Sequence, residues 1–247
     1  MRTICAMRLP TVTRHYRFDN YLNRCCENYP THELGPIAKL LDINRGNRIM
    51  TVSSFASKSA GLSEYIKTRV DATDEMKAAN FAQGDIITTV LTCARGETIL
   101  LRLDTTLPRS YSRDFTVRGT KGLYMQDTNS VFLDGDEESF EPVEYYKKAL
   151  NNAVKFEDEY LPGIWKNVTE ETLKAGHGGM DWFAYMGFTG ALINGEEMPV
   201  DVYDAATWQA VAVLSEMSIK QGGAPQIMPD FTNGKWFKRP RKDVCRL

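Results

Sequence analysis

The order of hydrophobic and polar positions changes along the chain from a helical period to an alternating one and back. Residues 31–42 show the three- and four-residue spacing of a helix. A second helical stretch is expected within 59–82, where a loose apolar face comprises Leu62, Tyr65, Ile66, Val70 and Met76. Both stretches precede the strand-like part of the chain, and we expect them to border one side of a site.

From residue 85 the apolar positions follow the patterns of strands. Residues 85–93 are rich in Ile, Thr and Val, residues 94–97 have turn character, and apolar side chains then alternate over 99–103. This pattern predicts a β-hairpin. Shorter strand-like stretches separated by turn residues follow at 112–118, 122–126 and 130–133. Together they predict a meandering, largely antiparallel sheet that needs cover on one face.

Helical spacing returns in the second half of the chain and can supply that cover. One amphipathic stretch has apolar positions at Val143, Tyr146, Leu150 and Ala153. A longer one, within 201–220, has them at Tyr203, Ala206, Ala210, Val213 and Met217. Tyr203 and Trp208 could instead form a platform for stacking a sugar, but core packing explains them better.

The fold class that this order predicts is α+β, with an open, largely antiparallel sheet covered by helices on one face. No internal repeat and no linker-like run divides the chain. We therefore expect one domain over residues 14–247 and leave residues 1–13 unassigned.

Composition and charge narrow the classes of function. The 247 residues are 43% hydrophobic and 25% charged, which is typical of a globular protein. A net charge of −2 provides no general basic field, so we expect neither a nucleic-acid nor a membrane partner. We interpret the basic tail as a solvated arm; it comprises Lys235, Lys238, Arg239, Arg241 and Lys242. No signal peptide or membrane-length apolar run is apparent, so the compartment is unknown, with the cytoplasm as the default.

The cysteines and histidines do not indicate a metal site. The chain has no C-x-x-C and no H-E-x-x-H motif, and His15, His32 and His177 lie far apart in the sequence. The five cysteines, two of them adjacent, fit a reducing compartment better than a disulfide framework. We therefore expect no metal.

The segment Tyr29-Pro30-Thr31-His32 is the first candidate for chemistry. Pro30 fixes its own φ and biases Tyr29 toward extended geometry, so we expect Thr31 to cap a helix that opens at His32, with Pro36 in or near its first turn. The helix dipole disfavours an imidazolium at this position and leaves a neutral ring that can accept a proton. The alternative is that Tyr29 and His32 simply pack at a helix start.

Two further segments carry polar groups that suit a ligand. Residues 105–113 form a hydroxyl-rich loop with two arginines after a strand, which suits a polyol or a phosphate. Residues 176–181 place His177 among glycines that include Gly178 and Gly179, just before an apolar helix. This second segment is a candidate site loop, or else a tight turn with Asp181 near the helix start.

Taken in order, several motifs of the chain resemble glycoside hydrolase family 109. The resemblance spans about residues 14 to 240 and rests on Tyr29-Pro-Thr-His32, Leu34-Gly-Pro36, Asn44-Arg-Gly-Asn-Arg48, Gly84-Asp85-Ile86, Pro108-Arg-Ser-Tyr-Ser-Arg113, Gly119-Thr-Lys-Gly122, Gly176-His-Gly-Gly-Met-Asp181, Asp201-Val-Tyr-Asp204 and Pro229-Asp-Phe-Thr232. That family contains NAD-dependent α-N-acetylgalactosaminidases within the Gfo/Idh/MocA oxidoreductase superfamily.

The resemblance implies the C-terminal substrate and oligomerisation domain of a two-domain enzyme. Its sugar-contacting positions carry over onto Arg17, Tyr29, Pro30, Thr31, His32 and Tyr111. Of these, His32, Tyr29 and Tyr111 are the expected catalytic residues, with His32 favoured for proton transfer and Tyr111 for positioning. The implied substrate is a glycoside of the N-acetylgalactosamine type, and the implied partner is a second copy of the chain or a separate Rossmann-domain chain.

The implied mechanism uses NAD as cofactor and differs from hydrolysis by two carboxylates. NAD⁺ takes a hydride from C3 of the sugar, the C1 substituent leaves by elimination, water adds, and the hydride returns. The chain has no G-x-G-x-x-G after a strand, so we expect the N-terminal Rossmann domain to be absent and the chain alone to be inactive. The alternatives are a fragment completed by a separate chain, a truncated sugar-binding or oligomerising homologue, and part of a sugar-specific Gfo/Idh/MocA oxidoreductase.

Overall fold

The computed structural model describes residues 16–136, 142–166 and 168–242, and these residues form two compact units. Unit 1 contains residues 16–111 and 200–242, and unit 2 contains residues 112–199. Each unit is described by itself below. The single domain expected over 14–247 stays a prediction, and residues 1–13 lie outside the described residues.

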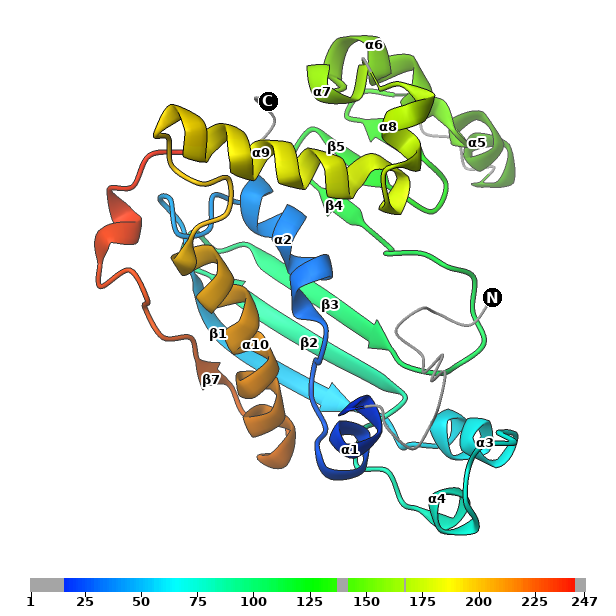
Figure 1. The fold of residues 1–247 in the computed structure, drawn as a ribbon. Helices are drawn as coiled ribbons and strands as arrows, with labels where there is room; N and C mark the ends of the chain where they lie inside the picture. Colours follow the sequence, from blue (N-terminus) through cyan, green and yellow to red (C-terminus); the bar gives the residue numbers. More distant parts are fainter. Residues whose placement is uncertain (1–15, 137–141, 167, 243–247) are drawn as a thin grey trace. The chain divides into compact units, whose positions relative to one another are not determined.

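Unit 1 is built on a four-stranded antiparallel sheet in the order β3-β2-β1-β7 (Figure 1). Its strands are β1 (Ile49–Ala56), β2 (Ile86–Cys93), β3 (Thr98–Asp104) and β7 (Gln226–Ile227). The hairpin predicted from residue 85 is confirmed as β2 and β3, joined by a short turn. Strands β1 and β7 were not predicted from the sequence, so no strand was expected on the far side of β2.

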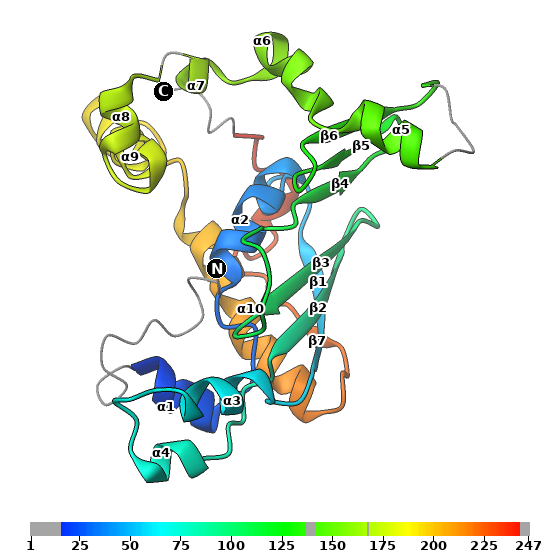
Figure 2. The same ribbon diagram turned by 90° about the vertical axis from the view of Figure 1, so that its right-hand side faces the viewer.

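Helices cover one face of this sheet, as the sequence predicts. Figures 1 and 2 show α2 (Pro30–Leu40) and α10 (Val202–Lys220) lying across the same face. Alternate strand residues such as Ile87, Leu91 and Leu101 are buried on that side, whereas Leu100 on the opposite side is 56% exposed. This alternation buries one apolar surface per strand and confirms the α+β class with an open antiparallel sheet.

The helix predicted within 201–220 is confirmed as α10, but its predicted apolar face is wrong at two positions. Val213 is 54% exposed and Met217 is 43% exposed. The buried face carries small polar residues between its apolar ones and comprises Asp204, Thr207, Trp208, Val211, Leu214, Ser215 and Ser218. Polar residues can be buried here because they have partners, for example the Ser218 hydroxyl that accepts the Ser54 backbone N–H at 2.8 Å.

A buried ion network ties α10 to the loop between α2 and β1. The Arg45 guanidinium donates to Asp204 Oδ1 at 2.8 Å and to Asp201 Oδ2 at 2.8 Å, and Lys39 Nζ donates to Asp204 Oδ2 at 2.9 Å. Asp201 also caps α10 in a capping box with Asp204. The Asn44 to Arg48 and Asp201 to Asp204 motifs are therefore parts of the scaffold of unit 1.

The expected helix within 59–82 is two short helices, α3 (Gly61–Lys67) and α4 (Asp74–Ala78). Together with α1 (Tyr16–Asn23) they enclose a second apolar cluster that includes Phe18, Tyr21, Leu62 and Ile66. The expected apolar face is wrong at Val70, which is 99% exposed because it lies in the turn between α3 and α4. A 3-10 turn, η4 (Lys235–Phe237), lies in the C-terminal part of unit 1.

Unit 2 holds a separate antiparallel sheet in the order β4-β5-β6. Its strands β4 (Thr116–Arg118), β5 (Gly122–Met125) and β6 (Ser130–Leu133) confirm the three predicted stretches, but they do not continue the hairpin of unit 1 into one sheet. The other elements are α5 (Pro142–Ala149), η2 (Asn152–Phe156), α6 (Glu157–Tyr160), α7 (Gly163–Lys166), α8 (Glu170–Lys174), η3 (His177–Gly179) and α9 (Met180–Asn194).

The amphipathic helix predicted from Val143 is confirmed as α5, but it ends at Ala149. Its predicted apolar face is not buried within the described residues, since Val143 is 65% exposed, Tyr146 47% and Leu150 54%. Ala149 of this helix is buried, and its backbone carbonyl accepts the Ser130 hydroxyl at 2.8 Å.

Candidate active site

The predicted site segment begins helix α2, two residues earlier than the expected cap at Thr31 and helix start at His32. Tyr29 occupies the N-cap and Pro30 is the first helical residue, where its missing N–H costs nothing. The expected cap by Thr31 is therefore wrong, because Thr31 already lies inside the first turn. Pro36 also lies further inside the helix than predicted. Because Tyr29 is the N-cap, His32 lies almost one helical turn further along, within reach of the Tyr29 side chain.

Tyr29 and His32 form a pair at the start of α2. Their rings are stacked, with centroids 4.3 Å apart and an interplanar angle of 23°. The Tyr29 hydroxyl lies 3.3 Å from His32 Nε2, and Thr31 Oγ1 lies 3.4 Å from His32 Nδ1. His32 is exposed and Tyr29 is partly exposed, so both polar edges can meet a ligand. The sequence prediction that these side chains are held close together is confirmed.

Arg17, on α1, approaches Tyr29 of this pair. Its guanidinium carbon lies 6.0 Å from the centre of the Tyr29 ring and 5.6 Å from that of Tyr16. These distances are at the outer limit for a cation–π contact. Arg17 and Tyr29 also border a pocket of about 200 Å³, and the other residues that line it are Tyr16, Asn20, Tyr21, Arg24, Cys26, Asn28, Gln83, Gln209 and Ala212. Side-chain amides, phenols and guanidinium groups dominate this lining, which suits a hydroxyl-rich ligand.

Two carboxyl groups that are not among the predicted site residues flank the segment. Glu27 precedes Tyr29 by two residues and Glu33 directly follows His32. Glu27 is fully buried, and its Oε1 accepts the Tyr29 backbone N–H at 3.1 Å. One oxygen of each carboxyl, Oε2, is buried without a hydrogen-bond partner. The acidic residues on both sides of Tyr29-Pro-Thr-His32 were visible in the sequence, but their burial was not.

Burial is the main cause of a raised pKa at both carboxyl groups. It raises the pKa of Glu33 to about 7, even though the nearby Arg109 charge and a backbone hydrogen bond from Arg102 act in the opposite direction. Burial and the neighbouring Glu33 charge raise the pKa of Glu27 well above its ordinary value. Titratable groups with strongly raised pKa values beside a pocket are typical of functional sites.

Tyr111 is the last residue of the first segment of unit 1, and it is 57% exposed. The contacts that join Tyr29, Thr31 and His32 do not include it. Its segment is fixed upstream, where Arg109 Nε lies 3.2 Å from Asp104 Oδ2 and the Leu107 backbone N–H donates to Asp104 Oδ1 at 3.1 Å. The role of Tyr111 in positioning a substrate stays a prediction.

The candidate loop around His177 belongs to unit 2. His177 Nδ1 lies 2.8 Å from Asp181 Oδ2, and the His177 side chain is 75% exposed. Gly178 and Gly179 have φ values of 67° and 92°, so they shape the tight turn that precedes α9. This geometry agrees with the turn interpretation, and a role of the loop in a site stays a prediction.

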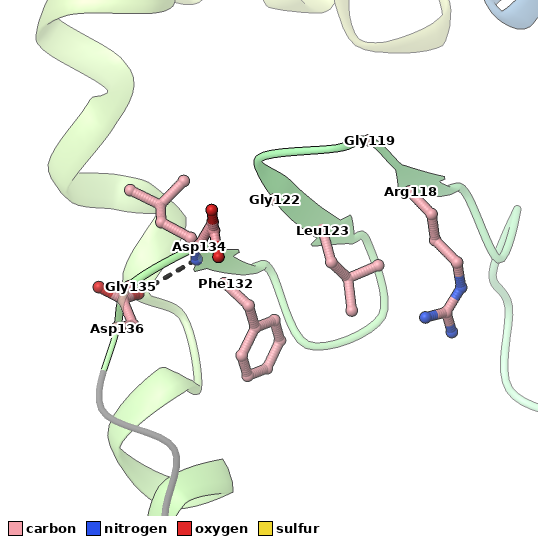
Figure 3. A pocket seen from close by; sticks show the side chains of 9 residues that line it. Arg118, Gly119, Gly122, Leu123, Phe132, Asp134, Gly135 and Asp136 are labelled. Atoms are coloured by element: carbon pink, nitrogen blue, oxygen red, sulfur yellow. Dashed lines mark hydrogen bonds between the residues drawn. The ribbon is translucent and has the colours of Figure 1, made fainter.

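Unit 2 also has a pocket of about 280 Å³ between the β4–β5 turn and the end of β6 (Figure 3). Arg118, Asp134 and Asp136 bring charge to it, and the Leu133 backbone N–H donates to the Asp136 carboxylate at 3.1 Å. None of the predicted site residues lines this pocket.

The described residues do not form a dinucleotide site. A Rossmann cradle needs a glycine-rich turn between a strand and a helix of a parallel sheet. The named strands of both units pair only in the antiparallel sense, and the chain has no G-x-G-x-x-G. The residues of the described ranges therefore do not fit NAD.

The same ranges contain neither a metal-binding cluster nor a membrane-spanning helix. No cluster of three or more His, Cys, Asp or Glu side chains there could hold a metal ion. No helix within residues 16–136, 142–166 and 168–242 is long and apolar enough to cross a membrane.

Comparison with known proteins then decides the family. The sequence profile described as "Glycosyl hydrolase 109, C-terminal domain" matches residues 8–238, which include most of both units. The chain belongs to glycoside hydrolase family 109. The family resemblance predicted from the ordered motifs is thereby confirmed, and so is the C-terminal placement of the chain within the family.

Individual members of family 109 are similar over most of the chain. A "Glycosyl hydrolase family 109 protein" of Stenotrophomonas maltophilia (strain K279a) is 42% identical over 225 residues, which cover 91% of this chain and 48% of that protein. An "Alpha-N-acetylgalactosaminidase" of Tannerella forsythia is 38% identical over 227 residues, covering 91% and 46%. An "Alpha-N-acetylgalactosaminidase" of Shewanella oneidensis (strain ATCC 700550 / JCM 31522 / CIP 106686 / LMG 19005 / NCIMB 14063 / MR-1) is 34% identical over 209 residues, covering 84% and 45%. The chain thus spans about half the length of these family 109 relatives.

Proposed function

We propose that this chain is the substrate-binding part of a family 109 glycosidase that acts on α-N-acetylgalactosaminides. The observation that carries the proposal is the Tyr29–His32 pair, whose polar atoms lie 3.3 Å apart at the start of α2 beside a polar pocket. Two relatives named "Alpha-N-acetylgalactosaminidase" support the choice of sugar. The proposed sugar contacts all lie in unit 1 and follow from the family resemblance: Arg17, Tyr29, Pro30, Thr31, His32 and Tyr111.

The chemistry of the pair suits proton handling at a sugar. A neutral imidazole at the first turn of a helix can accept a proton from a hydroxyl or an acidified carbon. The Tyr29 hydroxyl, which can donate or accept, lies against His32 Nε2 and can relay or orient that proton. Stacking fixes the two rings relative to each other, so a ligand meets them as one preorganised surface.

NAD remains the cofactor expected of the intact family enzyme. It would supply transient oxidation at the sugar ring. Since the described residues do not fit a dinucleotide, we assign its binding to a part of the longer protein outside these ranges, either in the same polypeptide or in a separate chain. What unit 1 contributes is the surface that binds and orients the sugar and that accepts or donates protons.

The lack of a dinucleotide cradle in both units also favours a second candidate, a sugar-binding or oligomerising module without catalysis. A sugar-specific Gfo/Idh/MocA oxidoreductase is a third. The three differ in what the protein does with NAD⁺. A glycosidase cleaves the glycoside without net NADH, an oxidoreductase accumulates NADH with a free sugar, and a binding module does neither.

The test measures binding before catalysis. The purified chain is titrated calorimetrically with N-acetylgalactosamine and with glucose. Wild type is compared with His32→Ala and with the control Tyr146→Phe, which changes an exposed aromatic residue of unit 2. We expect binding of the acetamido sugar that His32→Ala weakens at least tenfold and Tyr146→Phe leaves unchanged. Equal affinity for both sugars, or an affinity for N-acetylgalactosamine that His32→Ala leaves unchanged, would contradict the proposed site.

Cleavage is then assayed with a chromogenic α-N-acetylgalactosaminide, with and without NAD⁺. Cleavage that needs both NAD⁺ and His32 supports the glycosidase. Binding without cleavage in either condition favours the binding module, or a chain that depends on a further domain for its chemistry.

A further inference from the structure

We propose that the pocket beside Tyr29 is an anion subsite, in which the guanidinium groups of Arg17 and Arg24 bind a sulfate, phosphate or carboxylate group. Such a group can be an acidic substituent of the glycoside or a free inorganic anion, and the test below separates these two sources. The inference rests on the proposed function for the sugar that carries the acidic substituent. The anion subsite itself rests on the pocket and not on the sugar.

The first support is the composition of the pocket wall. Arg17 and Arg24 bring two guanidinium groups to a space of about 200 Å³, together with four side-chain amides and three phenols. None of the described residues that line this pocket is Asp or Glu. Arginine stays charged at every physiological pH, and its planar fork matches the oxygens of carboxylate and phosphate groups. Two such charges without a carboxylate in the same wall favour a negatively charged ligand group.

The second support is the spacing of the two arginines on and just after α1. Arg17, Asn20 and Arg24 follow one another at three and then four residues, which places them on one side of a helix. The Arg24 backbone N–H donates to the Asn20 carbonyl at 2.8 Å, so the helical path continues past Asn23. All three residues line the pocket. An anion there meets charges from two successive helical turns.

The third support is the way in which Arg24 is held. Its Nε and Nη2 donate to Glu216 Oε2 of α10 at 2.8 and 2.6 Å, while its side chain stays 42% exposed. Arg24 Nη1 donates to no group of the described residues. Glu216 Oε1 also accepts Lys220 Nζ at 2.8 Å, so the three side chains together keep one positive charge. The guanidinium is therefore oriented by the protein and can still offer a ligand a charge-assisted hydrogen bond.

A buried amide fixes another part of the wall. Gln83 is 1% exposed, and its Nε2 donates to the Cys26 carbonyl at 3.1 Å while its Oε1 accepts the Cys26 N–H at 3.1 Å. These bonds hold the stretch between Arg24 and Tyr29, and both ends of that stretch line the pocket. Glu27 lies within the stretch, but it is buried and does not line the pocket. Burial also raises the pKa of Glu27 well above its ordinary value, which weakens its opposition to an anion.

The test measures affinity for an anion with and without the sugar. Sodium sulfate, N-acetylgalactosamine, and the 4-sulfate and 6-sulfate of that sugar are titrated calorimetrically into the full chain, at low and at high sodium chloride. Wild type is compared with Arg24→Met and Arg24→Lys. Arg69→Met is the matched control, because Arg69 is also paired with a carboxylate, that of Asp71, but lies outside the pocket wall.

We expect wild type to bind at least one sulfated sugar about tenfold more tightly than N-acetylgalactosamine, with a difference that shrinks as the salt concentration rises. Sodium sulfate should compete with the sulfated sugar. Arg24→Met should bring the ratio of the two sugar affinities close to one, and Arg24→Lys should keep part of the difference, since it keeps the charge but loses the fork. Arg69→Met should leave the ratio unchanged.

Two results would overturn the anion subsite. One is a wild-type ratio close to one together with no measurable binding of sodium sulfate, and this readout needs no variant to fold. The other is a preference for sulfate that Arg24→Met leaves unchanged. Sulfate binding that depends on Arg24, without a preference for the sulfated sugars, supports the subsite and assigns it to a free inorganic anion.

Failure of the proposed function has a different signature. If sodium sulfate binds through Arg24 but none of the sugars binds, the anion subsite stands and the substrate assignment falls. If N-acetylgalactosamine binds through His32 but no binding of sulfate or sulfated sugar depends on Arg24, the substrate assignment stands and the anion subsite falls.

Discussion

The Tyr29 hydroxyl oxygen lies 3.3 Å from His32 Nε2, and the two rings stack with their centroids 4.3 Å apart. The pair exists because Tyr29 is the N-cap and Pro30 the first residue of α2, which brings position 32 back over position 29. Since one residue lies outside the helix and the other inside its first turn, the geometry depends on where the helix begins.

This relationship predicts that Tyr29 and His32 contribute to sugar binding as a unit. We expect Tyr29→Phe and His32→Gln each to weaken binding, and the double variant to lose less than the sum of the two, with a coupling energy of about 1 kcal/mol. The measurement is a double-mutant cycle by calorimetry with N-acetylgalactosamine. Neither side chain is buried, so the free energy of unfolding should change by less than about 0.5 kcal/mol in each variant. Strictly additive losses of affinity would show that the two rings act independently.

A second prediction concerns the buried network of unit 1. Arg45→Met leaves Asp204 and Asp201 without their shared guanidinium, and Asp204 is almost wholly buried. Removing one partner of a buried ion pair typically costs about 3–5 kcal/mol, so we expect a large fall in the free energy of unfolding measured in urea. Arg69→Met is the matched control, because the Arg69–Asp71 pair is partly exposed and close in sequence. Equal effects of the two substitutions would contradict a structural role for Arg45.

The same network sets an acid limit on stability. Burial alone would raise the pKa of Asp204, but hydrogen bonds and charges from Arg45 and Lys39 outweigh it and lower that pKa below the ordinary value. A carboxyl group whose pKa is lower in the folded state stabilises the fold above the unfolded pKa, about 3.9, and loses this contribution as the pH falls through the folded pKa. We expect the urea midpoint to drop as the pH falls below about 4. Asp204→Asn should flatten this pH dependence while lowering stability at pH 7, whereas an unchanged slope would assign the acid sensitivity to other groups.

Local patterns in the sequence were enough to predict the hairpin of β2 and β3 and the helices α2 and α10. In the hairpin the alternation is produced by one buried surface, which the sequence displays directly. In α10 the helical period was right, although Val213 and Met217 of the predicted apolar face are exposed. The start of α2 was misplaced by two residues, because the cap was expected at Thr31 and the structure has it at Tyr29. Threonine is a favoured N-cap residue, but proline is favoured at the first helical position, and Pro30 occupies that position in α2.

Most of the features that were not predicted depend on contacts between residues far apart in the sequence. Strand β1 contains Thr51, Ser53 and Ser54, which do not look like core residues, yet Ser54 is buried because its hydroxyl lies 2.8 Å from Thr89 Oγ1. The polar buried face of α10 depends in the same way on Arg45, more than 150 residues away. Glu27 and Glu33 were overlooked because nothing in the sequence distinguishes a buried glutamate from a solvated one.

A last prediction concerns the Asp85 carboxylate, which binds the start of α3 in unit 1. Asp85 accepts the backbone N–H groups of Ala60 and Gly61 at 2.7 Å and of Leu62 at 3.0 Å, so one carboxylate satisfies the start of α3. Its Oδ1 also accepts the Thr106 hydroxyl at 3.1 Å, which links α3 to the segment that leads to Tyr111. Asp85→Ala leaves buried donors unpaired, and we expect it to lower the free energy of unfolding by about 3 kcal/mol.

Thr73→Ala is the matched control for Asp85→Ala. Thr73 caps α4 through a single bond, from the Met76 N–H at 3.2 Å, in an exposed position. Its loss should cost about 1 kcal/mol or less. Asp85→Asn should behave like Asp85→Ala and not like wild type, because an amide offers one acceptor oxygen where the backbone presents donors to both. A fully stable Asp85→Asn variant would mean that the cap needs only one oxygen and that the link to Thr106 is dispensable.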